Sequence, residues 1–466
     1  TLMRIAPFLV RPQSFLFPIY EDDRNGPLRV SLGMWLYDGL ALFRNPRNHR
    51  FHDRAEILAE VPALRAEGLR GGPTYYDGAT DDARLTLENA KAAHRAGAVV
   101  VNHTELLDFS FDSEGKITGL VVQDRLSGEE WRIASRAVVN ATGPWSDQIR
   151  KMADPNCEPI LRKTKGIHFL IPASRLKIPH AVVMSALGDK RTIFAIPWGD
   201  DFVNVGTTDT TFEGDLDHVT ATPQDVEYLL ASLNAYFPRA EITETDIIST
   251  YAGLRPLIDD HVHAESQISR EHRILQCPRS GLVTIAGGKL TTYRRMAEEV
   301  VDYVIDTLRV EHGLAFPEPC RTAHLPLTEG DLGNAATLQR RVTDATERLG
   351  LSRETVRHLL RNYGGQYAAI LARIEEDRNL GRPIVEGLPF LAAEIPHAVE
   401  HEMTLALADF LGRRTQLLLL APNQGLDVAQ GIAEVLASLE EWDHRRIDRE
   451  LEHYHDIVAE TRRFRG

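Results

Sequence analysis

Six basic side chains are the residues of this chain whose types and placement could do chemistry. They share positions at the ends of expected strands: Lys165, His168, Arg255, Arg270, Lys289 and Arg294. The chain carries a net charge of −14, so a cluster of these cations would suit an anionic substrate such as a phosphate monoester. Each could instead be a solvated charge or half of an ion pair. Arg255 differs, because its apolar context, YAGLRPL, demands a partner if the side chain is buried.

The segment AGGKLTTYR, at 286–294, is the most suggestive of these contexts. An apolar run at 282–285 predicts a strand that ends before it, and a helical pattern over 291–308 follows, with one of its first two threonines as N-cap. The two glycines let a flat or charged group approach. The helix N-terminus and Lys289 favour an anion or a polar carbonyl. A plain strand-to-helix turn with a solvated lysine is the alternative.

A second strand–glycine–helix junction lies at 137–145. Its apolar strand runs into ATGPW, where Pro144 suits the first turn of a helix, so this junction too could receive a dinucleotide. Earlier, a helix capped at Thr80 and ended by Gly97 precedes an expected strand at 98–102. This α-to-β step is typical of a doubly wound sheet.

The rest of the chain predicts elements that would position these residues. Residues 158–260 are predicted to be mostly antiparallel β, with a crossover helix over 223–237. Helical periods dominate from about residue 317. The helices expected there span 352–363, 366–377, 395–411, 428–439 and 443–464.

The segment 30–43, VSLGMWLYDGLALF, predicts a helix that is apolar on nearly every face. One interpretation is a buried core helix. The other is a helix in a membrane interface, with Trp35 and Tyr37 at the level of the lipid headgroups and flanking arginines against anionic lipid.

Composition excludes some classes of protein. The 466 residues are 43% hydrophobic and 26% charged, which is ordinary for a globular protein. A net charge of −14 argues against nucleic-acid binding. The three cysteines are far apart and show no metal-ligand spacing, so we expect no metal site and a reducing compartment. The sequence predicts no membrane-spanning segment and no signal peptide.

Seven motifs in order resemble the FAD-dependent, aerobic glycerol-3-phosphate dehydrogenases. They are DDARL (81–85), NATGPW (140–145), KGIHFLIP (165–172), FAIPWGD (194–200), VGTTDT (205–210), YAGLRPL (251–257) and AGGKLTTYR (286–294). The segment HEMTLALADFLGRRT (401–415) is similar to that family's C-terminal domain.

The resemblance implies a flavoenzyme that oxidises sn-glycerol 3-phosphate at C2 to dihydroxyacetone phosphate, with hydride transfer to flavin N5 and electrons passed to quinone. By position it assigns the FAD contacts to Thr142, Gly143, Pro144, Trp145, Gly287, Gly288, Lys289, Leu290 and Thr291. Arg255 and Arg270 would hold the substrate phosphate, and His168 would accept the hydroxyl proton. Lys289 and the helix start at Thr291 would stabilise negative charge on the reduced flavin. His168 could also be an ordinary core histidine.

The resemblance also implies the architecture. An α/β FAD-binding domain, glutathione-reductase-like or D-amino-acid-oxidase-like, would cover 1–160 and 245–315, and an antiparallel β substrate domain 161–244. A C-terminal α-helical domain would cover 317–466. The protein would lie in the cytoplasm, peripherally on the cytoplasmic membrane, and a homodimer stays open.

One departure from the family matters. Its members open with a strand–GxGxxG–helix unit for the FAD pyrophosphate, and this sequence contains no GxGxxG. Because the sequence starts at Thr1 in a helical pattern, we expect upstream residues to be missing from it; loss of the ADP half of the site is the alternative. Three other functions also stay open: a glycerol-3-phosphate oxidase that uses O₂, a flavin-free remnant or assembly subunit, and an amino-acid oxidase relative.

Overall fold

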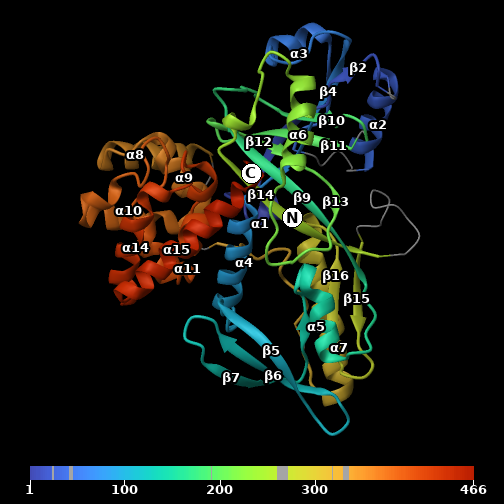
Figure 1. Ribbon diagram of the computed structural model, residues 1–466, viewed down its shortest axis with the longest axis vertical. Helices are drawn as coiled ribbons and strands as arrows, with labels where there is room; N and C mark the ends of the chain where they lie inside the picture. Colours follow the sequence, from blue (N-terminus) through green and yellow to red (C-terminus); the bar gives the residue numbers. More distant parts are fainter. Residues whose placement is uncertain are drawn as a thin grey trace.

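The protein is described by a computed structural model, which covers residues 1–23, 26–40, 46–189, 191–259, 271–316, 318–328 and 335–465. Figure 1 shows an upper lobe around a large sheet, a lower lobe with smaller sheets, and a helical region beside them.

Within the described residues the largest element is a mixed sheet of ten strands. Its order is β13-β9-β12-β11-β10-β1-β4-β2, with β14 beside β9 and β3 beside β4. Its strands are β1 (Arg11–Leu16), β2 (Ile19–Tyr20), β3 (Arg50–His52), β4 (Leu69–Ala79), β9 (Leu161–Pro172), β10 (Ala181–Ser185), β11 (Thr192–Trp198), β12 (Phe202–Gly206), β13 (Thr210–Thr211) and β14 (Ser249–Ile258). The expected β-rich region over 158–260 is therefore confirmed.

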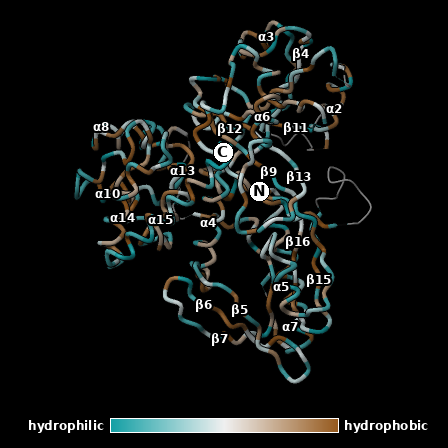
Figure 2. Tube along the Cα trace, viewed as in Figure 1, coloured by the Kyte–Doolittle hydropathy of each residue, from teal (hydrophilic) through white to brown (hydrophobic). Residues whose placement is uncertain are grey.

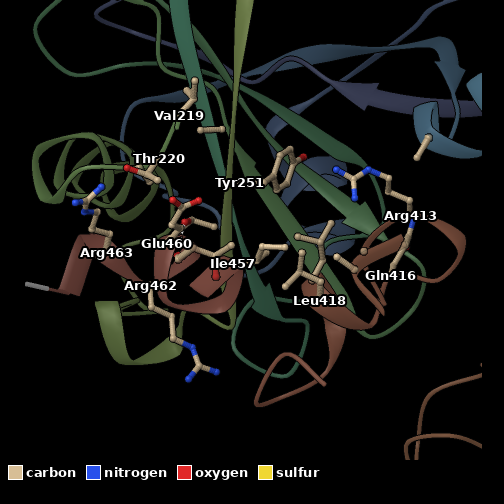
Figure 3. A pocket seen from close by; sticks show the side chains of 18 of the residues that line it. Val219, Thr220, Tyr251, Arg413, Gln416, Leu418, Ile457, Glu460, Arg462 and Arg463 are labelled. Carbon is tan, nitrogen blue, oxygen red and sulfur yellow. Dashed lines mark hydrogen bonds between the residues drawn. The ribbon is translucent and has the colours of Figure 1, made fainter. Parts of the chain in front are cut away.

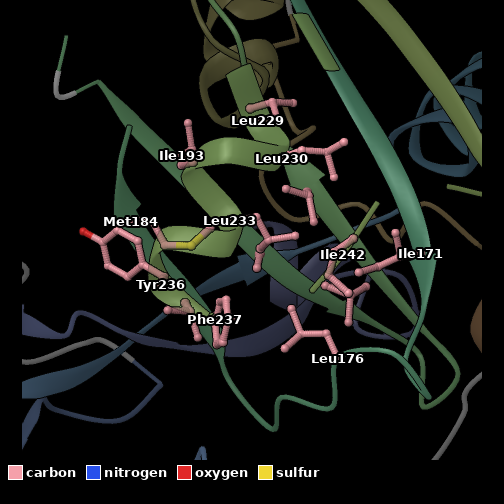
Figure 4. Close-up of a cluster of buried hydrophobic side chains, with 14 of the residues drawn as sticks. Ile171, Leu176, Met184, Ile193, Leu229, Leu230, Leu233, Tyr236, Phe237 and Ile242 are labelled. Atoms are coloured by element: carbon pink, nitrogen blue, oxygen red, sulfur yellow. The ribbon is translucent and has the colours of Figure 1, made fainter. Parts of the chain in front are cut away.

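Helix α6 (Pro223–Tyr236) closes one face of this sheet. The Thr222 hydroxyl accepts from the backbone N–H of Asp225, whose carboxylate accepts from the N–H of Thr222. This capping box stabilises the helix start where the sequence predicts it. The apolar side of α6 then packs on the sheet through Leu229, Leu233 and their neighbours (Figure 4). That leaves the opposite face of the sheet for other contacts.

The lower lobe holds two three-stranded sheets among the described residues. One has the order β15-β16-β8, built from β15 (His272–Gln276), β16 (Val283–Gly287) and β8 (Val139–Asn140). The other consists of β5 (Thr104–Phe111), β6 (Ile117–Asp124) and β7 (Glu130–Ala134). Its helices are α4 (Asp82–Arg95), α5 (Ser146–Ala153) and α7 (Tyr293–His312), with 3₁₀ turns η1 (Gly143–Trp145) and η4 (Leu290–Thr292).

The strand expected at 98–102 is wrong. These residues pair with no described strand, and Val99 and Val101 are 90% and 62% exposed. A run of valines becomes a strand only where a neighbouring edge accepts its backbone hydrogen bonds. The chain pairs again only from Thr104, at the start of β5.

The C-terminal region is helical, as expected. Its helices are α8 (Ala335–Leu349), α9 (Arg353–Tyr363), α10 (Tyr367–Glu376), α11 (Glu394–Glu402), α12 (Leu407–Asp409), α13 (Leu417–Leu420), α14 (Leu426–Glu440) and α15 (His444–Thr461). The single helix predicted over 395–411 is wrong, because α11 ends at Glu402 and the next residue, Met403, has a φ of +49°. Arg414 caps that end by donating to the carbonyls of Glu402 and Met403.

The N-terminal part contributes α1 (Leu2–Ile5), α2 (Pro27–Leu40) and α3 (Arg54–Glu60). The core-helix interpretation of 30–43 is wrong for the residues described, since Leu32 and Leu40 on α2 are 72% and 77% exposed. Residues 41–43 lie outside the described part. The division at 160 and 245 stays a prediction, although the large sheet takes strands from both sides of each boundary.

Candidate active site

The two glycine junctions lie at the same edge of the small sheet. Strands β8 and β16 run parallel, with Asn140 beside Thr284, so their carboxyl ends open in the same direction. Asn140 is buried; its amide N–H donates to the carbonyl of Ser146, and its oxygen accepts from the Thr142 hydroxyl at 2.7 Å. The crevice beyond the carboxyl ends of parallel strands is where such sheets bind ligands.

Glycine is required at the second junction. Gly287 and Gly288 have φ of +76° and +86°. A Cβ on Gly287 would lie 2.7 Å from the carbonyl oxygen of Glu271, and one on Gly288 would lie 2.3 Å from the sulfur of Met296. At the first junction, a Cβ on Gly143 would meet nothing within 4 Å. Gly287 and Gly288 are therefore required for close packing of the turn against Glu271 and Met296, whereas the space beside Gly143 is open to a flat cofactor.

The turn after the second junction presents cationic and polar groups. Lys289, Leu290 and Thr291 are exposed. The ammonium of Lys289 makes no hydrogen bond or ion pair with any residue in the described part of the chain, while its backbone N–H donates to the Thr292 hydroxyl at 3.3 Å. A free ammonium beside the start of a helix favours a negative charge in this place.

On the large sheet, an aromatic pair faces away from α6. His168 on β9 lies opposite Tyr251 on β14, and their rings stack at 5.0 Å with 6° between planes. Asn204 donates to the Tyr251 hydroxyl at 2.8 Å. A Cβ on Gly206 would lie 2.2 Å from Nδ1 of His168, so the glycine of VGTTDT makes room for the imidazole.

Burial sets the charge of His168. Burial and, to a smaller extent, the positive charge of Arg255 outweigh the opposing effect of Asn204 and lower the pKa of the imidazole to about 4. His168 is therefore neutral at neutral pH. Its Nδ1 is buried without a hydrogen-bond partner.

Arg255 has the partner that its apolar context demands. Its guanidinium donates to Oδ1 of Asp209 at 3.1 Å, to the carbonyl of Thr208 and to the hydroxyl of Thr207. It lies over Gly166, where a Cβ would come within 2.5 Å of it. Strand alternation places Arg255 on the same face as Tyr251, so His168, Tyr251 and Arg255 form one row.

The structure separates the other cations from this row. Lys165 points to the α6 face and pairs with Asp225 at 2.5 Å. Arg294 pairs with Glu298 at 2.9 Å within α7. Arg270 lies outside the described residues. The two lobes meet where β14 ends, since a Cβ on Gly287 would lie 2.9 Å from Ile258.

A cleft of about 1470 Å³ opens beside Tyr251 (Figure 3). Trp198 and Tyr251 from the sheet, Leu290 from the glycine turn, and Gln416 and Ile457 from the helical region line it. A smaller cavity of about 450 Å³ shares Trp198, Leu290 and Gln416 with the cleft. The three parts of the fold therefore enclose one space.

Polar bonds hold these walls together. The Trp198 indole donates to the amide oxygen of Gln416 at 2.9 Å, and the Gln416 amide donates to the carboxylate of Asp81 at the start of α4. The Trp145 indole of η1 donates to Asp217, another lining residue, at 3.0 Å.

Sequence reasoning missed several of these residues. Tyr251 could have been found, because it lies four positions before Arg255 and shares its strand face. Asp209 lies inside a quoted motif, but nothing local marks it as the partner of Arg255. Gln416 lies far along the chain from the other cleft residues, and no sequence motif marks it as part of the site.

Known protein families match both parts of the chain. The model of the FAD dependent oxidoreductase family matches residues 6–294. The model of the C-terminal domain of alpha-glycerophosphate oxidase matches residues 320–447.

Curated relatives and a solved structure agree with these matches. The aerobic glycerol-3-phosphate dehydrogenase of Staphylococcus haemolyticus is 36% identical over 93% of this chain and 77% of its own length. That of Staphylococcus aureus is 33% identical over 98% of this chain and 81% of its own length. The crystal structure of the glycerol-3-phosphate dehydrogenase from Bacillus halodurans, complexed with FAD, superposes with a TM-score of 0.82 at 31% identity, over 99% of this chain and 84% of that one.

These matches confirm the expected architecture: a D-amino-acid-oxidase-like FAD-binding fold with an antiparallel sheet and a helical C-terminal domain. The chain belongs to the FAD-dependent oxidoreductases and, among them, to the family of the aerobic glycerol-3-phosphate dehydrogenases.

Proposed function

We propose that this protein oxidises sn-glycerol 3-phosphate to dihydroxyacetone phosphate with FAD as its cofactor. The observation that carries the proposal is the row His168, Tyr251 and Arg255, in which Tyr251 lines a cleft that also reaches Leu290 of the glycine turn. FAD, when bound, accepts the two electrons of the alcohol. The open space beside Gly143 and the exposed turn at Lys289, Leu290 and Thr291 fit a flat group of this kind.

We assign the following tasks to the protein's own residues. Arg255 binds the phosphate, held in place by Asp209, and Arg270 is proposed to join it. Lys289 and the helix start behind it favour negative charge at the flavin ring. Thr142, Gly143, Pro144, Trp145, Gly287, Gly288, Leu290 and Thr291 complete the proposed cofactor contacts.

We further propose that the electrons pass to a membrane quinone. The experiment that tests both proposals is anaerobic addition of sn-glycerol 3-phosphate to the flavin-loaded protein, followed by a quinone analogue or by O₂. Loss of the oxidised-flavin absorbance and its rapid return with the quinone analogue supports them. Peroxide formation that outpaces quinone reduction favours the oxidase, and protein that takes up no flavin favours the remnant.

His168 is proposed to accept the hydroxyl proton, which predicts an unusual pH profile. A general base must be unprotonated, so kcat/KM rises as the pH rises through the pKa of the base. Because the pKa of His168 is about 4, protonation of His168 should not lower kcat/KM between pH 7 and about pH 5. The His168→Gln variant should lose roughly 100-fold or more in kcat. If kcat/KM falls below about pH 6 in this variant as well, the titrating group is the substrate phosphate. If the fall lies near pH 6.5 and is absent from the variant, the lowered pKa of the buried His168 is disproved.

Helix α2 is proposed to bind a membrane surface. One face of this helix carries large exposed apolar side chains: Leu28, Leu32, Trp35, Leu36 and Leu40. The helix itself lies at the outer edge of the upper lobe (Figure 2). On the other side, the buried Asp38 accepts from the backbone N–H of His49 and pairs with its ring at 2.7 Å. The helix is thus anchored with its apolar face outward, as an interfacial helix requires. In the described part of the chain, none of the helices is long and apolar enough to cross a bilayer.

Charges on this face should release the protein from lipid. The double variant Leu32→Glu/Leu36→Glu removes two exposed leucines, so binding to vesicles that contain anionic lipid should fall by roughly tenfold or more in sedimentation assays. Val310→Glu, at an equally exposed valine of α7, is the matched control and should bind as the wild type does. If the wild type, the double variant and the control bind vesicles equally, α2 does not contact the membrane.

A further inference from the structure

Two cysteines that are far apart in the sequence meet in the lower lobe. The sulfurs of Cys157 and Cys277 and a carboxylate oxygen of Asp154 all lie within 4.8 Å of one another. Sγ of Cys277 is 3.8 Å from Oδ2 of Asp154. The spacing of the two cysteines along the chain does not predict this pair.

Both cysteines lie in turns and are partly accessible. Cys157 closes the turn after α5, and its N–H donates to the carbonyl of Asp154 at 3.0 Å. Cys277 follows β15 and exchanges backbone hydrogen bonds with Leu282 and Gly281 across the turn to β16. Both are only partly buried. The sulfurs, which lie within 4.8 Å of each other, would have to approach to the roughly 2.05 Å of a disulfide, and partial burial leaves them open to a small oxidant.

The two thiols differ in how they ionise. Burial opposes ionisation of Cys277, but donors from the Ser280 side chain and from the backbone N–H groups of Ser280 and Arg279 outweigh it and lower the pKa of this thiol. Burial, with Cys277 close by, raises the pKa of Cys157. The pair therefore consists of one better nucleophile and one neighbouring thiol that stays protonated.

We propose that Cys157 and Cys277 are a redox-sensitive thiol pair that hydrogen peroxide converts into a disulfide. The Cys277 thiolate attacks one peroxide oxygen, the O–O bond breaks, and hydroxide leaves, which forms a sulfenic acid on Cys277. Cys157 then attacks that sulfur, the S–S bond forms, and water leaves with the Cys157 proton. In total, two thiols and one peroxide give one disulfide and two waters.

The bond would join two segments that carry the glycine junctions. The turn at Cys157 follows η1 and α5, while the turn at Cys277 leads through β16 into Gly287. A disulfide here would fix the far end of the small sheet, opposite the edge where those junctions open.

The test uses the full chain with its flavin, in buffer with EDTA. Peroxide should lower the intact mass by about 2 Da, dithiothreitol should restore it, and a non-reduced digest should contain the Cys157–Cys277 peptide. The Cys157→Ser variant should stop at a sulfenic acid that dimedone traps on Cys277. The Cys277→Ser variant should react at least tenfold more slowly than the wild type. Cys320→Ser, which removes the exposed third thiol, should behave as the wild type does.

Three results would overturn the proposal. The first is an unchanged mass under peroxide while free Cys320 is oxidised. The second is a digest in which Cys320 supplies the linked partner. The third, in a parallel run without EDTA, is protection of both thiols that addition of EDTA removes, since Asp154 and the two sulfurs would then be ligands of a thiophilic metal ion.

Discussion

Replacement of Arg255 by alanine is expected to lower kcat/KM for sn-glycerol 3-phosphate by roughly 100- to 1000-fold, mainly through a higher KM. A lost charge-assisted hydrogen bond to a desolvated anion costs about 3–4 kcal/mol, and each 1.4 kcal/mol is about tenfold. Asp209, Thr207 and Thr208 already fix the guanidinium, so little ordering is needed when phosphate binds. Steady-state kinetics measure the loss, and absorbance should show unchanged flavin content, because Arg255 lies on the large sheet and not at the glycine turns.

Two further variants separate phosphate binding from damage to the sheet. Arg255→Ala leaves the Asp209 carboxylate without its guanidinium partner, and the double variant Arg255→Ala/Asp209→Asn removes that unpaired charge. The double variant should regain thermal stability but not affinity for sn-glycerol 3-phosphate. Arg175 forms a comparable pair with Asp246 at 2.6 Å and lies outside the row of His168, Tyr251 and Arg255. Arg175→Ala should keep the wild-type KM, whereas a wild-type KM in Arg255→Ala would disprove the phosphate assignment.

The sequence predicts part of the row on the large sheet because strand geometry is local. Positions two and four apart on a strand share a face, so the order of residues alone places Arg255 and Tyr251 on one side of the sheet. Their neighbour His168 is different. Its place opposite Tyr251 depends on the register of β9 against β14, and no motif specifies that register.

The roles of Lys165 and Asp225 show the limit of reasoning from residue type. Lys165 lies three positions from His168 and looks equally suited to an anion. An odd spacing on a strand turns it to the other face, where Asp225 of the α6 capping box neutralises it. Strand alternation could have predicted its direction; the carboxylate that meets it comes from a separate element.

Helix α2 illustrates a second limit. A segment that is apolar on nearly every face predicts a helix but not what surrounds it, since core and membrane interface both favour such residues. Only the fold shows that Asp38 faces inward and the leucines outward. The break after α11 is similar, because the arginine that caps it, Arg414, lies 12 residues beyond Glu402 in the chain.

A buried ionic cluster joins α4 to the helical region. Arg84 donates to both carboxylate oxygens of Glu402, at 2.7 and 2.8 Å, and Lys91 bridges Glu402 and Glu88. All four charged side chains are buried, and Arg84 also stacks over Tyr363 at 4.7 Å. Burial alone would raise the pKa of Glu402, but Arg84 and Lys91 outweigh it and hold that pKa below its ordinary value. Because the pKa of Glu402 is lower in the folded than in the unfolded protein, its ionised carboxylate stabilises the fold at pH values above the ordinary carboxyl pKa. This stabilisation is lost as the pH falls through the pKa of the folded state.

Glu402→Gln is therefore expected to weaken the attachment of the helical region by about 3–5 kcal/mol, because it leaves Arg84 and Lys91 buried with too little negative charge. Hydrogen exchange of the α11 amides measures the loss locally, which matters because a chain with several domains need not unfold in one step. The activity should fall too, since α4 starts at Asp81 and that carboxylate holds Gln416 in the wall of the cleft.

Glu400, two residues away on the same helix, provides the matched control. It pairs with Arg373 at the surface, where both side chains are partly exposed, so Glu400→Gln should cost less than about 1 kcal/mol. A double variant, Arg84→Met/Glu402→Leu, should recover most of the loss, because it removes the central bidentate pair and leaves Lys91 with Glu88 and Gln366. Equal hydrogen exchange in Glu402→Gln and Glu400→Gln would mean that apolar packing, and not the ionic cluster, holds the helical region against α4.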